Sequence, residues 1–218
     1  MLLVELVALI TSLVYVRKQR IGQLFILYIL LDITVLLIDF YLFSFGEKNK
    51  TARSIFISYA NASIGLIELV AYFNFFKHVL KNRLIVKTMS ALEILFVIIM
   101  LLYFMTGFKF LSERLGYISY LIGVIEFIFL LLPCAIFFYE IINNDSILTL
   151  AERPSFWVTT GIFFYAFISI PFYLLSRYFL GSEYKLQYIL AATLFNIPYS
   201  INFIFLIKAF LCKKNLTI

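Results

Sequence analysis

Charged residues are scarce in this chain of 218 residues, because Asp, Glu, Lys and Arg together make up only 14% of it. Soluble domains average about 25% charged residues. Hydrophobic residues make up 64% of the chain, and the mean hydropathy is +1.03. A single soluble domain of this length could not bury so much apolar surface. The composition therefore excludes a soluble protein and predicts an all-α, polytopic membrane protein that lies in a lipid bilayer.

Cysteine and histidine are almost absent, which excludes several kinds of site. The two cysteines, Cys134 and Cys212, allow neither a disulfide framework nor a Cys/His metal spacing, so they are interpreted as core or interface residues. His78 is the only histidine and stands among basic residues at the end of an apolar stretch, which indicates an interfacial position. No pair of nucleophile and base can be built from it. We therefore predict that the chain is not an enzyme and has no catalytic residues, metal site or cofactor.

Seven apolar stretches cover most of the chain, and all but the first reach the roughly 20 residues that cross a bilayer. They lie at about residues 1–16, 21–45, 54–80, 84–108, 115–142, 155–180 and 186–211. The connections are short, the longest running from Asn143 to Pro154, so consecutive helices are expected to pack antiparallel in one bundle. The sequence thus predicts a single seven-helix transmembrane domain over residues 1–218.

The basic residues indicate the orientation of this bundle. Arg17, Lys18 and Arg20 follow the first apolar stretch, which is the wrong order for a cleaved signal peptide. With the N-terminus outside, eleven of the 18 Lys and Arg residues face inward and seven face outward. This bias predicts an N-out, C-in orientation in a cell inner membrane. Because the positive charges gather at helix ends, the net charge of +6 is attributed to membrane anchoring and not to nucleic-acid binding.

Two segments of equal length suggest an internal repeat. Residues 5–20, ELVALITSLVYVRKQR, and residues 68–83, ELVAYFNFFKHVLKNR, match at seven of sixteen positions without a gap. The Glu at one end and the Lys and Arg at the other carry most weight, because apolar matches arise readily by coincidence in this composition. Glu126 and Asn196 occupy similar places in the fifth and seventh stretches. These matches favour a parallel 2+2+2+1 arrangement of helix hairpins, with coincidence as the alternative.

Acidic residues lie where this composition accommodates them least. At about 1.5 Å per helical residue, five acids fall in a layer from the membrane midplane outward, and no Lys or Arg is expected there: Glu5, Asp32, Glu68, Glu93 and Glu126. Polar and small residues recur beside them at helical spacing, which is typical of faces that pack inside a bundle. Five ionised carboxyls without cationic partners would be very costly in hydrocarbon. They must be protonated, hydrated or neutralised by a ligand.

Two interpretations of these acids stay open. In the first, neutral carboxyls only hydrogen-bond across helices and specify packing, while Glu5 and Asp39 extend toward water near the surface. In the second, an acidic cavity in the outer half, closed below by aromatic and aliphatic side chains, binds a small cation, a proton or an amine. The residues expected to bind this ligand are Asp32, Glu68, Tyr72, Glu93, Glu126 and Asn196.

Some features of the chain are shared with one group of membrane proteins. They are a Glu in the first stretch followed by Tyr15 and a basic turn, Glu68 in the third, the run Pro154–Trp157 that opens the sixth, and Asn196 with Tyr199 in the seventh. On these features the chain resembles the small stand-alone seven-helix membrane proteins of Bacteroidota. The resemblance implies an inner-membrane location and brings no assigned activity.

Three functions are compatible with this sequence. The leading hypothesis is a non-enzymatic sensor or accessory subunit of a membrane complex that binds a small cation, a proton or an amine-bearing ligand. The main alternative is a carrier or channel that moves a cation or proton through the same acids. The second alternative is a structural or immunity-type membrane protein whose acids only pack. Short loops leave no room for an output domain, so a sensor would act through a membrane protein partner or a second copy of the chain.

Overall fold

The computed structural model describes the chain except for residues 16–19, 46–49, 108–113, 144–146, 180–184 and 213–218. Its elements are α1 (Leu2–Tyr15), α2 (Arg20–Phe45), α3 (Lys50–Val79), α4 (Arg83–Gly107), α5 (Arg114–Asn143), η1 (Ile147–Glu152), α6 (Pro154–Phe179) and α7 (Lys185–Leu211). No strand occurs among the described residues, and the predicted all-α fold is confirmed. Each predicted apolar stretch corresponds to one α-helix, whose ends lie within four residues of the predicted ends.

The connection between α5 and α6 contains a short 3₁₀ helix, η1, that the sequence did not predict. The indole nitrogen of Trp157 donates a hydrogen bond of 2.7 Å to the carbonyl of Ala151 in this helix. On its other side, the Lys208 ammonium lies 5.7 Å from the centre of the Trp157 ring. Trp157 therefore joins the start of α6 both to η1 and to the end of α7.

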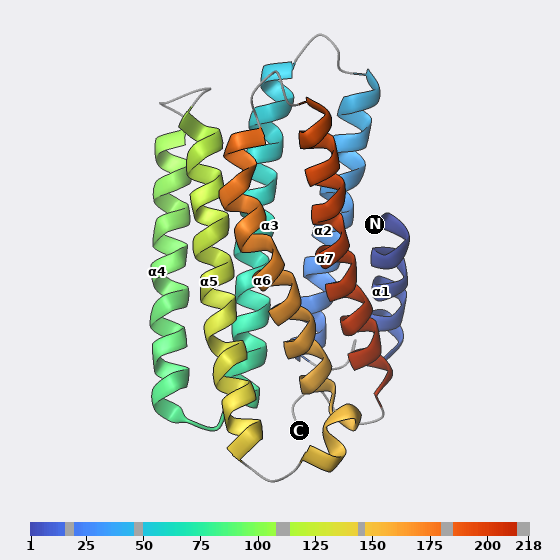
Figure 1. Cartoon of the computed structure of the whole chain (residues 1–218), viewed down its shortest axis with the longest axis vertical. Helices are drawn as coiled ribbons and strands as arrows, with labels where there is room; N and C mark the ends of the chain where they lie inside the picture. The colour runs from blue at the N-terminus through green and yellow to red at the C-terminus, as the bar shows by residue number, and fades with distance from the viewer. Residues whose placement is uncertain (16–19, 46–49, 108–113, 144–146, 180–184, 213–218) are drawn as a thin grey trace.

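Consecutive helices run antiparallel, and their ends gather at the two ends of the bundle (Figure 1). The lower end in Figure 1 holds the turn from α3 to α4, the η1 segment and the C-terminal end of α7. α1 is the shortest α-helix, with 14 residues, and begins at about half the height of the bundle in Figure 1.

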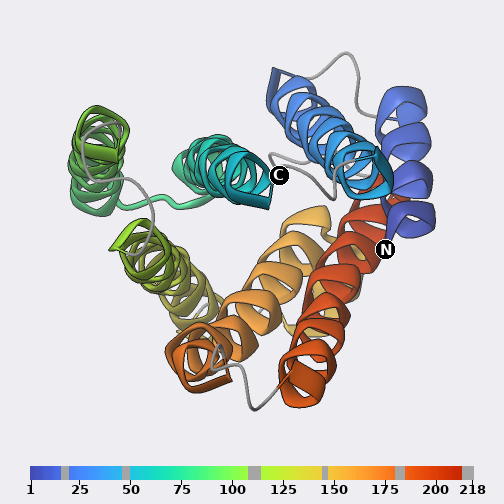
Figure 2. The same ribbon diagram turned by 90° about the horizontal axis from the view of Figure 1, so that it is seen from above.

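The helices α1, α2, α3, α5, α6 and α7 are joined in a closed ring by their contacts, and Figure 2 shows this arrangement from above. Contacts run from α1 to α2, α3, α5, α6 and α7 in turn, and from α7 back to α1. α4 packs outside this ring, against α3 and α5. Its position explains why it has the smallest buried share of the candidate membrane spans. The ring encloses an interior, and the core of the protein lies there.

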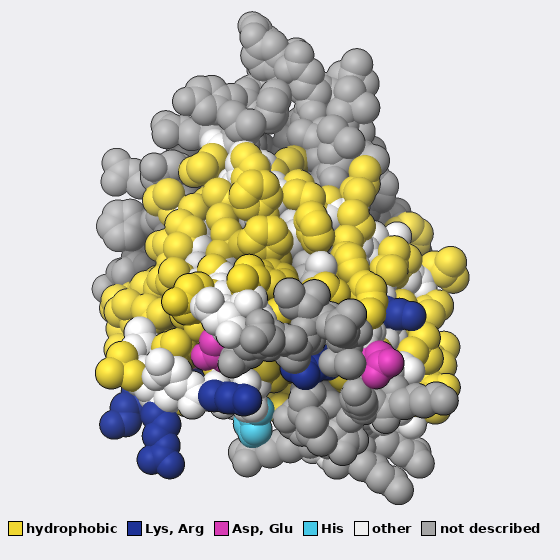
Figure 3. Space-filling view, turned by 60° about the horizontal axis from the view of Figure 1, so that its bottom comes forward, with side chains coloured by type: hydrophobic (Ala, Val, Ile, Leu, Met, Phe, Trp, Pro, Cys, Tyr) yellow, Lys and Arg dark blue, Asp and Glu magenta, His cyan; other side chains and the backbone are white. Residues whose placement is uncertain are grey.

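The outer surface of the bundle is apolar. Leu3, Leu84 and Met105 are each more than 70% exposed, and apolar side chains cover much of the face in Figure 3, with Lys, Arg and His toward the lower end. Within the described residues, four helices are long and apolar enough to cross a membrane, namely α2, α4, α5 and α6. Such a surface requires lipid contact, because soluble proteins do not expose apolar patches on this scale. These features indicate a membrane protein.

α3 is not among these four spans, and its position in the fold explains its more polar sequence. It has neighbours on three sides, α2, α4 and α5. No side chain is exposed between Ile64 and Phe76. A helix covered by other helices can contain polar residues, because they face protein and not lipid.

Candidate functional site

Four carboxyl groups lie buried inside the helix ring, each on a different helix. The exposed fraction is 0% for Glu5 on α1, 6% for Asp32 on α2, 3% for Glu68 on α3 and 7% for Glu126 on α5. Each interacts electrostatically with the next, from Glu5 to Asp32 and from Asp32 through Glu68 to Glu126. We call these four residues the acidic row.

The row forms because the acids stand at similar levels in their helices. At about 1.5 Å per residue, Glu68 is about 17 Å from the lower end of α3, and Asp32 is about 18 Å from the lower end of α2. Glu126 is about 26 Å from the lower end of α5 by the same measure. Asp32, Glu68 and Glu126 therefore all lie in the middle part of their helices.

Two tyrosine hydroxyls connect the acidic row to α7. Tyr199 on α7 donates a hydrogen bond to Asp32, and Tyr28 on α2 donates to the Tyr199 hydroxyl at 3.3 Å. The Tyr28 hydroxyl is also within hydrogen-bonding reach of the Glu68 carboxyl. Phe203 fixes both rings, since it stacks on Tyr28 at 6.0 Å and meets Tyr199 edge-on at 5.1 Å between ring centres.

A second polar contact crosses the ring beside the acidic row. The side-chain amide of Asn202 on α7 donates a hydrogen bond of 2.8 Å to the Tyr72 hydroxyl on α3. Both side chains are fully buried. Tyr72 stands one turn from Glu68, so this predicted site residue does lie in the interior. Asn202 was not predicted, although its position three residues after Tyr199 places it on the same side of α7.

A glycine allows Glu126 to approach α3. A Cβ atom at Gly65 would lie 2.5 Å from Oε2 of Glu126, so the carboxyl occupies the space that any larger residue would need. Gly65 stands three residues before Glu68 and shares its helix face. This close contact between α3 and α5 brings the two carboxyls together.

Some acceptor atoms of the acidic row have no hydrogen-bond partner in the described part of the protein. Among the described residues, both carboxyl oxygens of Glu5 and Oε1 of Glu68 are buried without a hydrogen-bond partner. The charged group near Glu5 is the amino group of Met1. In the described part of the chain, no Lys or Arg side chain forms an ion pair with the row. A buried polar atom left unpaired costs about 1–3 kcal/mol, so these oxygens are places where a proton or a donor would bind favourably.

Aromatic side chains close the interior below the row, as the sequence predicts. Phe25 packs against Tyr72, Phe75 and Phe210 with ring centres 5.5, 6.3 and 6.0 Å apart. Phe75 also packs against Phe76 at 5.2 Å. All five side chains are at most 2% exposed. We call this layer the aromatic floor.

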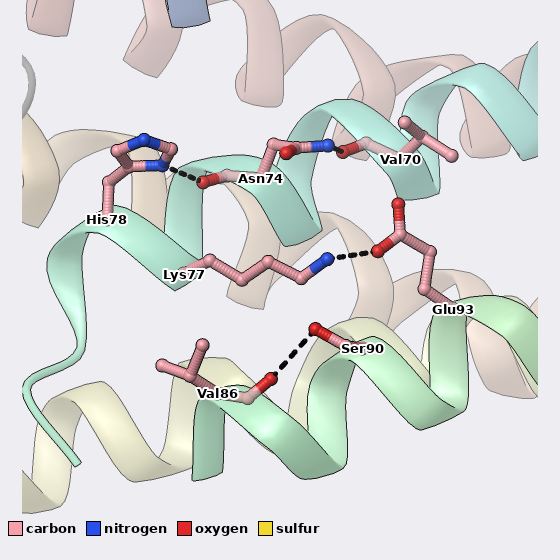
Figure 4. A network of polar contacts seen from close by, with 7 residues as sticks. All are labelled: Val70, Asn74, Lys77, His78, Val86, Ser90 and Glu93. Atoms are coloured by element: carbon pink, nitrogen blue, oxygen red, sulfur yellow. Dashed lines mark hydrogen bonds and ion pairs between the residues drawn. The ribbon is translucent and has the colours of Figure 1, made fainter. Parts of the chain in front are cut away.

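The structure does not bring Glu93 to the acidic row. Its carboxyl lies between α3 and α4, where it pairs with the ammonium group of Lys77 (Figure 4). The expectation that no Lys or Arg reaches the level of the acids is therefore wrong for Glu93. That expectation placed each charge at the height of its backbone, whereas the long Lys77 side chain extends toward the acid. Glu93 is also on the helix that lies outside the ring.

Asn196 is exposed and does not line the interior. It shares a face of α7 with Phe203, seven residues later. Tyr28 packs on that face at Phe203. Asn196 stands two turns higher on the same face, beyond the reach of Tyr28, and is exposed. Among the described side chains of α7, the buried polar residues are instead Tyr199 and Asn202.

Glu5 does not extend toward water, as one interpretation of the sequence had it. It is fully buried, because α1 packs against both α2 and α7. Asp39 is partly exposed. Glu5 thus belongs to the interior, while Asp39 stays outside the acidic row.

Within the described residues, no group of three or more His, Cys, Asp and Glu side chains could hold a metal ion. Cys134 is a buried free thiol whose sulfur lies 3.8 Å from the carbonyl oxygen of Thr159. No protein-family model, curated protein or solved structure matches this chain. The function is therefore inferred from the acidic row itself.

Proposed function

We propose that this protein binds a small positively charged group, a proton or a protonated amine, in the acidic row. The observation that carries the proposal is the burial of Asp32, Glu68 and Glu126 side by side, from three helices, without a Lys or Arg partner among the described residues. In this proposal the protein acts as a sensor or as an accessory subunit of a membrane complex.

Electrostatics supports a cationic ligand. An ionised carboxyl at this depth costs several kcal/mol, and neighbouring carboxyls disfavour each other's ionised form. A proton removes the charge, and an ammonium group both compensates it and donates hydrogen bonds to the unpaired oxygens of Glu68 and Glu5. Either ligand would therefore relieve the cost of the acidic row.

The proposal includes a membrane topology. We infer a multi-pass protein of an inner membrane with seven spanning helices, N-out and C-in, and the bias of Lys and Arg toward one side supports this orientation. The lower end in Figure 1 then faces the cytoplasm. The aromatic floor would separate the acidic row from that side, so the ligand would enter from the outside. The burial of both Glu5 and Glu68 is consistent with the 2+2+2+1 repeat.

Ligand binding can be tested on the full chain in lipid nanodiscs. Methylammonium chloride, compared with sodium chloride at equal ionic strength, should raise the unfolding temperature. A ligand at 100 times its Kd stabilises by about 2.7 kcal/mol. Proton binding should appear as titration of the infrared carbonyl band of protonated carboxyls. Both responses should be lost in Glu68→Gln and Glu126→Gln.

Glu93→Gln is the matched control, because Glu93 is a partly buried acid outside the acidic row. It should retain both responses. Responses that survive Glu68→Gln and Glu126→Gln, or that are absent from the wild type, would contradict the proposal and favour acids that only pack. Flux of protons or methylammonium into proteoliposomes, lost in Glu68→Gln, would identify a carrier that uses the same residues.

A further inference from the structure

We propose that the hydroxyls of Tyr28 and Tyr199 form a proton relay between Glu68 and Asp32, so that one proton is shared by two carboxyls on neighbouring helices. This inference rests on the proposed function and specifies it. The ligand of this part of the acidic row is the proton, and the two hydroxyls are its path.

The relay is a continuous series of contacts that joins three helices. It begins at Glu68 on α3, reaches the Tyr28 hydroxyl on α2, crosses to Tyr199 on α7 over 3.3 Å and returns to Asp32 on α2. The link between the two hydroxyls is longer than the usual length of such a bond, which is about 2.7–2.8 Å. The rings of both tyrosines are held by Phe203, so their hydroxyls stay at this spacing.

Each hydroxyl has a single proton, which fixes the direction of the series. Tyr199 donates to Asp32, and Tyr28 donates to Tyr199. In the proposed relay, Tyr28 has no second proton to donate, so the Glu68 carboxyl donates to the Tyr28 oxygen. In this arrangement Glu68 is protonated and Asp32 is ionised. If every hydrogen bond in the series reverses its donor and acceptor, Glu68 is ionised and Asp32 is protonated.

Transfer between the two arrangements conserves every atom and charge. Glu68 gives its proton to the Tyr28 oxygen, the Tyr28 proton passes to the Tyr199 oxygen, and the Tyr199 proton passes to Asp32. Afterwards Glu68 is a carboxylate, Asp32 is a carboxylic acid and both tyrosines are neutral. No other reactant is needed.

A separate observation points to proton binding at Glu68. Its Oε1 is buried without a partner, and the side chain is only 3% exposed, so this oxygen can accept a proton without losing another bond. Besides Tyr28 and Tyr199, the titratable groups that interact electrostatically with the two carboxyls come from four helices of the ring. They are Glu5 of α1, Tyr72 of α3 itself, Glu126 of α5 and Tyr165 of α6.

Infrared difference spectroscopy of the full chain in nanodiscs tests the relay. Titration in pH should change the carbonyl band of Glu68, identified by its loss in Glu68→Gln. In step with it, the C–O band of Tyr199, identified by its loss in Tyr199→Phe, should change because the hydroxyl reverses its donor. Tyr28→Phe breaks the path, so it should abolish the Tyr199 change while the Glu68 band still titrates.

Tyr72→Phe is the matched control, because Tyr72 is as buried as Tyr28 but bonds to Asn202 outside the relay. It should retain the Tyr199 change. A Tyr199 change that persists in Tyr28→Phe, or that never accompanies the Glu68 titration, would overturn the relay and leave the proposed function standing. Absence of both the Glu68 titration and the methylammonium response would overturn the proposed function as well.

Discussion

The Glu126 carboxyl on α5 occupies the space that a side chain would fill at Gly65 on α3. The atom that a Cβ at position 65 would meet is the far end of a flexible side chain. Gly161 on α6 is also tightly packed but has different neighbours, since a Cβ there would lie 2.8 Å from the Cβ of Phe205 and 3.3 Å from the backbone oxygen of Asn202. The two glycines therefore predict two different consequences of the same substitution.

Gly65→Ala should displace the Glu126 carboxyl from Glu68 without unfolding the protein. The displaced side chain can rotate, and replacing Gly by Ala inside a helix gains up to about 1 kcal/mol of helix propensity. We expect a stability change below about 1 kcal/mol and a clear loss of the methylammonium and proton responses. Gly161→Ala should instead destabilise by about 1–3 kcal/mol, because backbone and Cβ atoms cannot move aside. Equal losses of stability in both variants would contradict this account of Gly65.

Glu5→Met should stabilise the protein. Both carboxyl oxygens of Glu5 are buried without a hydrogen-bond partner among the described residues, and removing an unsatisfied buried group recovers about 1–3 kcal/mol. Met has a similar length and flexibility, so it should fill the same space. Unfolding by denaturant in mixed micelles measures the change. A loss of stability of the same size would mean that the Glu5 carboxyl holds α1 to its neighbours.

Lys77 and Glu93 should couple when both are replaced. The two side chains are 19% and 17% exposed, between a surface pair worth about 0–1 kcal/mol and a buried pair whose disruption costs about 3–5 kcal/mol. We expect Lys77→Met alone to cost about 1–3 kcal/mol, since it leaves Glu93 unpaired. Lys77→Met with Glu93→Gln should cost less than the sum of the single changes. Additive effects in this double-mutant cycle would show that the pair does not fix α4 to α3.

Much of the fold follows from the sequence, because helix length and apolar composition are local properties. The predicted stretches match the α-helices, and the positions of Asp32, Glu68 and Glu126 in their stretches predict a common level. Glu93 was placed with them because height along a helix does not say which helix stands outside the ring. That information is a property of the packing of all seven helices.

The faces of α7 could not be predicted for the same reason. Asn196 and Phe203 share a helical face, yet only Phe203 is covered, because cover depends on where Tyr28 and the other neighbours lie. Tyr199 was noted in the sequence only as part of the resemblance, and its hydrogen bond to Asp32 requires α2 and α7 to meet across the ring. A pattern of one helix contains no such information.

Phe25→Ala should open the aromatic floor beneath the acidic row. Phe25 is fully buried and contacts three other members of the floor, so its loss should leave a cavity and cost about 3–5 kcal/mol. Phe25→Leu keeps most of the volume and provides a milder second variant if Phe25→Ala does not fold. Phe40→Ala is the control, because Phe40 is on the same helix and 71% exposed.

In proteoliposomes that contain a pH-sensitive dye, Phe25→Ala and, to a smaller extent, Phe25→Leu should increase the passive proton leak. The reason is that water can then enter between the acidic row and the lower end of the bundle, whereas the side chains of the wild-type floor are at most 2% exposed. Phe40→Ala should leave the leak at the wild-type level, since Phe40 is 71% exposed and is not part of the aromatic floor. A leak that stays at the wild-type level in a folded Phe25→Ala protein would show that another layer closes the interior, and the floor would then be a packing feature alone.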